Sequence, residues 1–142
     1  MRFAYPVEVH EEADGITVTC PDVPEMVTGG WGDRAANLEA APDALATALS
    51  GYVEEGRRLP QPSPARGRPV VAVPVLAAAK LALHEAKLAA RISNVELGRR
   101  LGIGEKEVRR LLDPLHRSHV GQVETALRAL GGRLVVETGK AA

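Results

Sequence analysis

Long cationic side chains are concentrated in the second half of this 142-residue sequence, between residues 99 and 119. Arginine and lysine side chains near the start of a helix can reach guanine edges and phosphates in the major groove of DNA. The residue types therefore indicate recognition of a nucleic acid. We predict that DNA is contacted by Ser93, Arg99, Glu105, Lys106, Arg109, Arg110, Arg117, Ser118 and His119.

Two short helices must hold these side chains. Ser93 and Glu96 form an S-x-x-E capping box at the start of the first helix, and Gly98 lets another helix approach closely. Gly102 lies where a helix would end in the left-handed conformation. A second helix then begins near residue 104 or 105 and ends at Asp113-Pro114, burying Val108, Leu111 and Leu112. This pattern predicts a helix-turn-helix. The alternative is an ordinary bundle in which Gly102 only links two helices.

Flanking segments complete this half of the chain. The Ala-, Leu- and Lys-rich segment 76–91 predicts a preceding helix. A following helix is predicted from the apolar residues Val120, Val123, Leu127 and Leu130, and its start at residues 117–119 favours a bound phosphate. Residues 133–138 predict a final strand. A lone strand leaves its backbone unpaired, so we expect it to pair with a second copy of the chain through Leu134, Val135 and Val136.

The first half has strand patterns around one helix. Residues 3–10 place Phe3, Tyr5, Val7 and Val9 on one face, and Asp14-Gly15 predicts a hairpin turn into a strand at 16–20. A short third strand is predicted at 26–28. The helix that follows starts at Asp33 and contains Pro42, so it either kinks there or begins there as a longer helix. A proline-rich loop at 59–69 leads to a strand at 70–73.

Composition and charge narrow the function. Residues 1–68 carry six Lys and Arg against eleven Asp and Glu, whereas residues 69–142 carry twelve against seven. These opposite charges suggest an anionic partner for the second half and a basic one for the first. The apolar stretch at 70–79 is too short to span a bilayer, which needs about 20 residues, and the start has no signal-peptide core. We expect a cytoplasmic protein without membrane association.

With these motifs in order, the sequence resembles the HicB antitoxin family, in its helix-turn-helix branch. The resemblance is carried by residues 15–25, which end in a Pro-Asp-x-Pro turn, by 28–33, by Asp43-Ala44-Leu45, and by 97–114, 126–131 and 133–137. Glu25, where the family often has glycine, and Pro42 depart from the pattern.

The resemblance implies an α+β chain, in which residues 1–73 form a partial RNase H-like β-β-β-α-β domain and residues 74–142 form the DNA-binding domain. It also implies a small basic partner, a HicA-type mRNA-cleaving toxin, and repression of the protein's own operon by binding operator DNA. We assign Asp22, Glu25 and Trp31 to the toxin-binding surface.

Two other functions fit the sequence less well. A nuclease would need carboxylates that converge on a cation, but Asp14, Asp22 and Asp33 each fit a turn or a helix cap. The four histidines and Cys20 lack metal-ligand spacing, and Cys20 is expected to be a small core residue. We therefore predict neither an enzyme, a metal nor a cofactor. The remaining alternative is a stand-alone transcriptional regulator whose N-terminal domain senses a small ligand.

Overall fold

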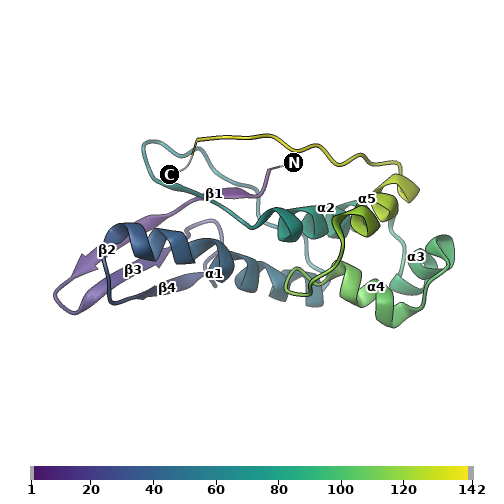
Figure 1. The fold of residues 1–142 in the computed structure, drawn as a ribbon, viewed down its shortest axis with the longest axis horizontal. Coiled ribbons are helices and arrows are strands. Elements are labelled where there is room, and N and C mark those ends of the chain that lie inside the picture. The colour runs from purple at the N-terminus through teal and green to yellow at the C-terminus, as the bar shows by residue number, and fades with distance from the viewer. Residues whose placement is uncertain (1, 141–142) are drawn as a thin grey trace.

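The computed structural model describes residues 2–140 and shows a strand-rich N-terminal part followed by helices (Figure 1). This arrangement confirms the predicted α+β class. In chain order the elements are β1 (Ala4–Pro6), β2 (Glu8–Glu12), β3 (Gly15–Thr19), β4 (Val27–Gly30), α1 (Arg34–Glu54), β5 (Val70–Ala72), α2 (Val75–Ala90), α3 (Asn94–Leu101), α4 (Glu105–Leu112) and α5 (Val120–Ala129).

The predicted hairpin and third strand form an antiparallel sheet in the order β2-β3-β4. The prediction of one strand across residues 3–10 was wrong, because the chain changes partner at Val7. Before Val7, β1 pairs with β5, and Tyr5 lies opposite Val71. After it, β2 pairs with β3, and Val9 lies opposite Val18. The predicted β-β-β-α-β order thus becomes β-β-β-β-α-β.

Helix α1 packs against this sheet and begins where the sequence predicts. The Asp33 carboxylate accepts a hydrogen bond from the Ala36 amide at 2.8 Å, which satisfies a donor that the helix itself cannot. The helix continues through Pro42 as one element, so the alternative of a helix that begins at Pro42 was wrong. Leu45 and Leu49 of its apolar stripe are fully buried, whereas Leu38 and Ala48 are partly buried.

The N-terminal elements enclose what we call the first core, which includes Tyr5, Val7, Val18, Leu45 and Leu49. Cys20 is buried in it, as predicted, and its thiol donates a hydrogen bond to the Pro6 carbonyl. Burial raises the pKa of this thiol, so it stays protonated.

Helix α2 lies between the first core and a second core, which is built from α2, α3, α4 and α5. Ala77 and Leu81 of α2 belong to the first core, whereas Ala79 and Leu83 belong to the second. The predicted boundary at residues 73 and 74 thus precedes a helix that both cores share. The rest of the second core is formed by Leu97, Val108, Leu111, Leu112, Val123, Ala126 and Leu127.

The C-terminal segment, described up to residue 140, forms no strand within the single chain. Residues 133–138 pair with no strand among residues 2–140, and their pairing with a second copy of the chain stays a prediction. The segment runs back from α5 toward the N-terminal half (Figure 1), and Glu137 forms an ion pair with Arg2 at 2.9 Å. Val120 was also placed wrongly in the apolar stripe of α5, since it is exposed at the first residue of that helix. Within the described part of the chain, no helix is both long and apolar enough to cross a membrane.

Candidate nucleic-acid interface

Helix α3 begins with the predicted cap but uses Glu96 differently. The Ser93 hydroxyl accepts from the Glu96 amide at 3.1 Å, as expected for an N-cap. The Glu96 carboxylate was predicted to bond back to Ser93, which was wrong. It instead accepts hydrogen bonds from Arg99 at 2.7 and 2.6 Å and from Arg100 at 3.1 Å. These charged donors lower the pKa of Glu96 to about 2.

The turn between α3 and α4 depends on two glycines. Gly102 ends α3 in the left-handed conformation at φ 70°, as predicted. A side chain on Gly98 would place its Cβ 2.7 Å from the Ile103 carbonyl oxygen and 3.3 Å from Val108. Glycine at position 98 therefore lets the turn fold back onto α3, and the Ile103 amide donates to the Gly98 carbonyl at 3.0 Å.

Helix α4 is amphipathic over its eight residues. Val108, Leu111 and Leu112 are buried in the second core, as predicted. The predicted contact residues of this helix all lie on its exposed side: Glu105, Lys106, Arg109 and Arg110. The structure therefore places three cations of one short helix outside the core, where a polyanion could approach them.

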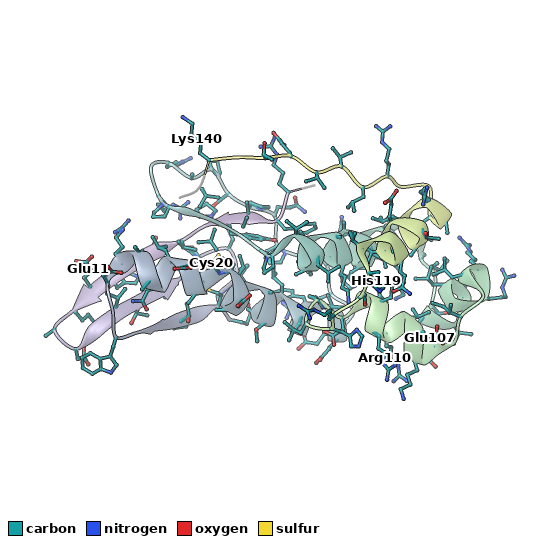
Figure 2. The ribbon with its side chains drawn as sticks, in the orientation of Figure 1. Glu11, Cys20, Glu107, Arg110, His119 and Lys140 are labelled. Carbon is teal, nitrogen blue, oxygen red and sulfur yellow. The ribbon has the colours of Figure 1, made fainter. Side chains whose placement is uncertain are left out.

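Two grooves flank α4 and separate its two arginines. Arg110 lines a groove of about 960 Å³ with the loop residues Arg117, Ser118 and His119. Figure 2 shows Arg110 and Glu107 projecting from α4, with His119 toward α5. Arg109 lines the other groove, of about 540 Å³, together with Glu54 at the end of α1. The structure thus brings Arg110 together with the predicted phosphate-binding loop, and it places Arg109 nearer an acidic helix end.

Ser93 and Arg99, the predicted DNA contacts outside α4 and the 117–119 loop, differ in how freely they could bind a phosphate. Ser93 is exposed and lies at the groove that Arg109 lines. Arg99 is exposed, but both of its hydrogen bonds go to Glu96, whose negative charge offsets its own. The same pairing raises the pKa of Arg99.

A buried lysine behind α4 was missed by the sequence analysis. Lys80 of α2 is completely buried, and its ammonium group lies within hydrogen-bonding distance of four oxygen atoms. Three are the carbonyl oxygens of Arg110, Asp113 and His116, and the fourth is the Ser118 hydroxyl. Burial lowers the pKa of Lys80, and the nearby Asp113 carboxylate partly opposes this shift. Helix propensity alone could not predict that Lys80 is buried, because a lysine within a helix is normally assigned to the exposed surface.

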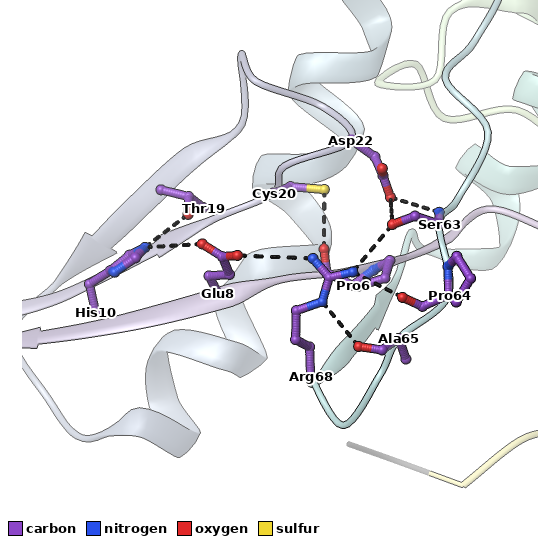
Figure 3. A network of polar contacts seen from close by, with 10 residues as sticks. All are labelled: Pro6, Glu8, His10, Thr19, Cys20, Asp22, Ser63, Pro64, Ala65 and Arg68. Atoms are coloured by element: carbon purple, nitrogen blue, oxygen red, sulfur yellow. Dashed lines mark hydrogen bonds and ion pairs between the residues drawn. The ribbon is translucent and has the colours of Figure 1, made fainter.

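The predicted toxin-binding residues separate into two groups. Asp22 accepts hydrogen bonds from the Ser63 amide and hydroxyl, both at 2.9 Å, and this network holds the proline-rich loop against the strands (Figure 3). Glu25 accepts from the Tyr52 hydroxyl at 2.7 Å, which lowers the pKa of Glu25. Trp31 is 85% exposed. Asp22 and Glu25 thus each bond to another segment of the N-terminal half, whereas the Trp31 side chain projects into solvent, and the assignment of all three to a toxin-binding surface stays a prediction.

The predicted dimerisation residues are also divided. Leu134 packs partly against the second core, while Val135 and Val136 are exposed at 72% and 69%. Two neighbouring exposed valines on an extended backbone are apolar surface that this chain leaves uncovered.

Sequence comparison with known proteins identifies the family of this chain. A family model described as a HicB-like antitoxin of bacterial toxin-antitoxin systems matches residues 3–82. The chain belongs to the HicB antitoxin family. The "Antitoxin HicB" of Pseudomonas fluorescens is 39% identical over 138 residues, which cover 96% of this chain and 94% of that protein. "Antitoxin HicB 2" of Photorhabdus laumondii is 40% identical over 92% of each chain, and "Antitoxin HicB" of Escherichia coli K12 is 36% identical over 92% of this chain and 95% of its own.

These HicB matches extend beyond the N-terminal half. The family model ends at residue 82, within α2, whereas the three relatives cover more than nine-tenths of the chain. The sequence similarity to these relatives therefore covers both the HicB-like N-terminal part and the segment that forms α3, α4 and α5 in this chain.

Proposed function

We propose that this HicB family member is an antitoxin that neutralises a HicA-type mRNA-cleaving toxin and represses its own operon. The observation that carries the DNA-binding part is the geometry of α3 and α4. Two eight-residue helices are joined by a three-residue turn, and the second helix exposes Lys106, Arg109 and Arg110. We interpret this pair as a helix-turn-helix with α4 as the recognition helix.

In this proposal α4 enters the major groove of operator DNA, and α3 lies across the phosphate backbone. Lys106 and Arg110 are suited to guanine edges. Arg117 and His119, at the start of α5, lie where helix amides and the helix dipole favour a phosphate.

The proposed toxin-binding surface lies on the N-terminal half, a partial RNase H-like domain in this interpretation. The excess of acidic residues in this half suits a basic, RNA-binding partner. Such charge complementarity would mainly speed the association of the two proteins and set the orientation in which they meet. Strand β4 forms an edge of its sheet and leads directly to the exposed Trp31. An edge strand offers unpaired backbone groups to a partner, and a large exposed aromatic side chain is a typical centre of a protein interface.

We further propose that the protein acts in the cytoplasm as a homodimer or a larger homo-oligomer. Residues 133–138 of two chains would pair as antiparallel strands and cover Val135 and Val136, which are exposed in the single chain. Two recognition helices in such a dimer would read half-sites about 34 Å apart.

The test separates the two activities with single substitutions. Lys106→Ala and Arg109→Ala should weaken binding to the DNA upstream of the gene, measured by fluorescence anisotropy, and leave toxin neutralisation intact. Trp31→Ala should weaken toxin binding, measured by calorimetry with the basic protein encoded beside this one, and leave DNA binding intact. The reverse pattern, with Lys106→Ala abolishing neutralisation but not DNA binding, would refute this division of the chain.

A further inference from the structure

The most unusual side chain outside the exposed surface is Lys80, in the middle of α2. It has no exposed surface, although lysine is almost never fully buried unless it is paired. Its four oxygen partners all belong to residues 110–118, at distances from 2.5 to 3.0 Å. A single ammonium group thus contacts both the end of α4 and the loop that precedes α5.

The first of these contacts caps the recognition helix. The last four carbonyl groups of an α-helix lack partners within the helix. The Arg110 carbonyl is one of them in α4, and the Asp113 carbonyl follows just after the helix. A cation at a helix C-terminus also interacts favourably with the helix dipole. Lys80 therefore satisfies the end of a helix that is too short to be stable alone.

The remaining contacts fix the loop that follows. The same ammonium group binds the His116 carbonyl and the Ser118 hydroxyl, on either side of Arg117. Arg117 and His119 line the groove that Arg110 also lines. The segments that carry the cations on both sides of this groove therefore share one buried partner, the Lys80 ammonium group.

We propose that Lys80 is a positioning residue for DNA recognition, which sets the end of α4 and the segment 116–119 in the relative geometry that DNA contact requires. This inference rests on the proposed DNA-binding function. Lys80 cannot touch DNA itself, because it is buried, and it acts through Arg110, Arg117 and His119. An apolar side chain of the same length would fill the same space but would leave the carbonyl groups unpaired.

The test removes the positive charge of Lys80 from the full chain and keeps a long, unbranched side chain at this position. Lys80→Met removes the three N–H donors that the four oxygen atoms share, and Lys87→Met is the matched control. Lys87 lies two turns further along α2, is partly buried, and makes no hydrogen bond within residues 2–140. Affinity for operator DNA is measured over a series of salt concentrations well below the melting temperature, together with circular dichroism and toxin binding.

We expect Lys80→Met to stay folded, to bind toxin normally, and to show operator affinity reduced at least about tenfold. The slope of log affinity against log salt should fall by about 0.9 for each phosphate that the variant no longer neutralises. A residue that only stabilised the fold would lower the apparent affinity by the unfolded fraction and leave this slope unchanged. Lys87 lines the groove of Arg109, so Lys87→Met removes one nearby cation without touching the α4–α5 connection, and it should lose much less affinity than Lys80→Met.

A second variant keeps the proposal testable if Lys80→Met fails to fold. Lys80→Gln retains donor groups without the charge, and it should show a smaller loss of affinity and a smaller fall in slope. A folded Lys80→Met or Lys80→Gln protein with unaltered affinity and slope would overturn the proposal. If the unaltered protein binds no DNA from the region upstream of its gene, the proposed DNA-binding function itself fails, and this proposal fails with it.

Discussion

Replacing Arg110 with alanine tests the proposed interface most directly. The Arg110 side chain is exposed and forms no ion pair within residues 2–140. Its backbone carbonyl accepts the hydrogen bond from Lys80, and the substitution leaves that group in place. Arg110→Ala should therefore leave the melting temperature nearly unchanged, so that any loss of DNA affinity reports the side chain itself.

The expected loss follows from the kind of interaction that is removed. A good contact to a base edge contributes about 1–3 kcal/mol to discrimination against the wrong base. Its loss corresponds to a dissociation constant that is larger by roughly 5- to 140-fold for each half-site. Fluorescence anisotropy with operator DNA measures the specific affinity, and the same assay with a scrambled duplex measures the nonspecific affinity. Removing a base contact lowers the ratio of specific to nonspecific binding, whereas removing a phosphate contact weakens binding to both duplexes and flattens the salt dependence.

Arg128→Ala is the matched control. It removes the same charge from the same half of the chain, but Arg128 lies near the end of α5 and pairs with Glu124 at 3.8 Å. We expect only a small loss of affinity for this variant. Equal losses for Arg110→Ala and Arg128→Ala would mean that net charge alone drives binding, and the proposed role of α4 would then be refuted.

Two further predictions concern the α3–α4 pair itself. Gly98→Ala should lower the free energy of unfolding by about 1–3 kcal/mol, because the new Cβ would lie 2.7 Å from the Ile103 carbonyl oxygen. Gly121→Ala, in open space on α5, should instead raise it by up to about 1 kcal/mol in the same urea denaturation series, and equal effects would contradict the packing argument. The stability contribution of Glu96 should be complete above about pH 5 and lost as pH falls toward about 2, because its pKa in the folded state lies below its ordinary value. The difference in unfolding free energy between the unaltered protein and Glu96→Gln should therefore shrink over this range, and a constant difference would argue against the Arg99 and Arg100 hydrogen bonds.

The features that could be predicted from the sequence depend on local chemistry. Asp33 and Ser93 cap helices because their side chains reach amides three residues ahead, and Gly102 adopts a conformation that other residues avoid. The hairpin turn at Asp14-Gly15 is local in the same sense. Interactions over a few residues leave a pattern in the sequence, so the existence and order of these elements were predictable.

The features that could not be predicted depend on which of several possible partners a polar group or a strand binds in the folded chain. Glu96 at the third helical position fits a capping box, but two arginines within a turn offer a charged partner in place of a neutral amide. The alternation across residues 3–10 marks a buried face correctly, since Tyr5 and Val7 are fully buried. It does not show that the strand changes partner between β5 and β3 at Val7.

Helix α2 shows most clearly why a hydropathy pattern underdetermines this site. A helix with one core on one side has a polar face in solvent, so its charged residues can be assigned to the surface. Helix α2 lies between two cores, and its buried polar residues are each bonded to another segment. Glu85 accepts from the Leu59 amide at 2.6 Å, and His84 bonds to the Arg57 carbonyl at 2.7 Å. Lys80 binds the end of α4. Because these partners lie 26 to 38 residues away, the role of Lys80 arises only when the tertiary structure brings residues 110–118 around it.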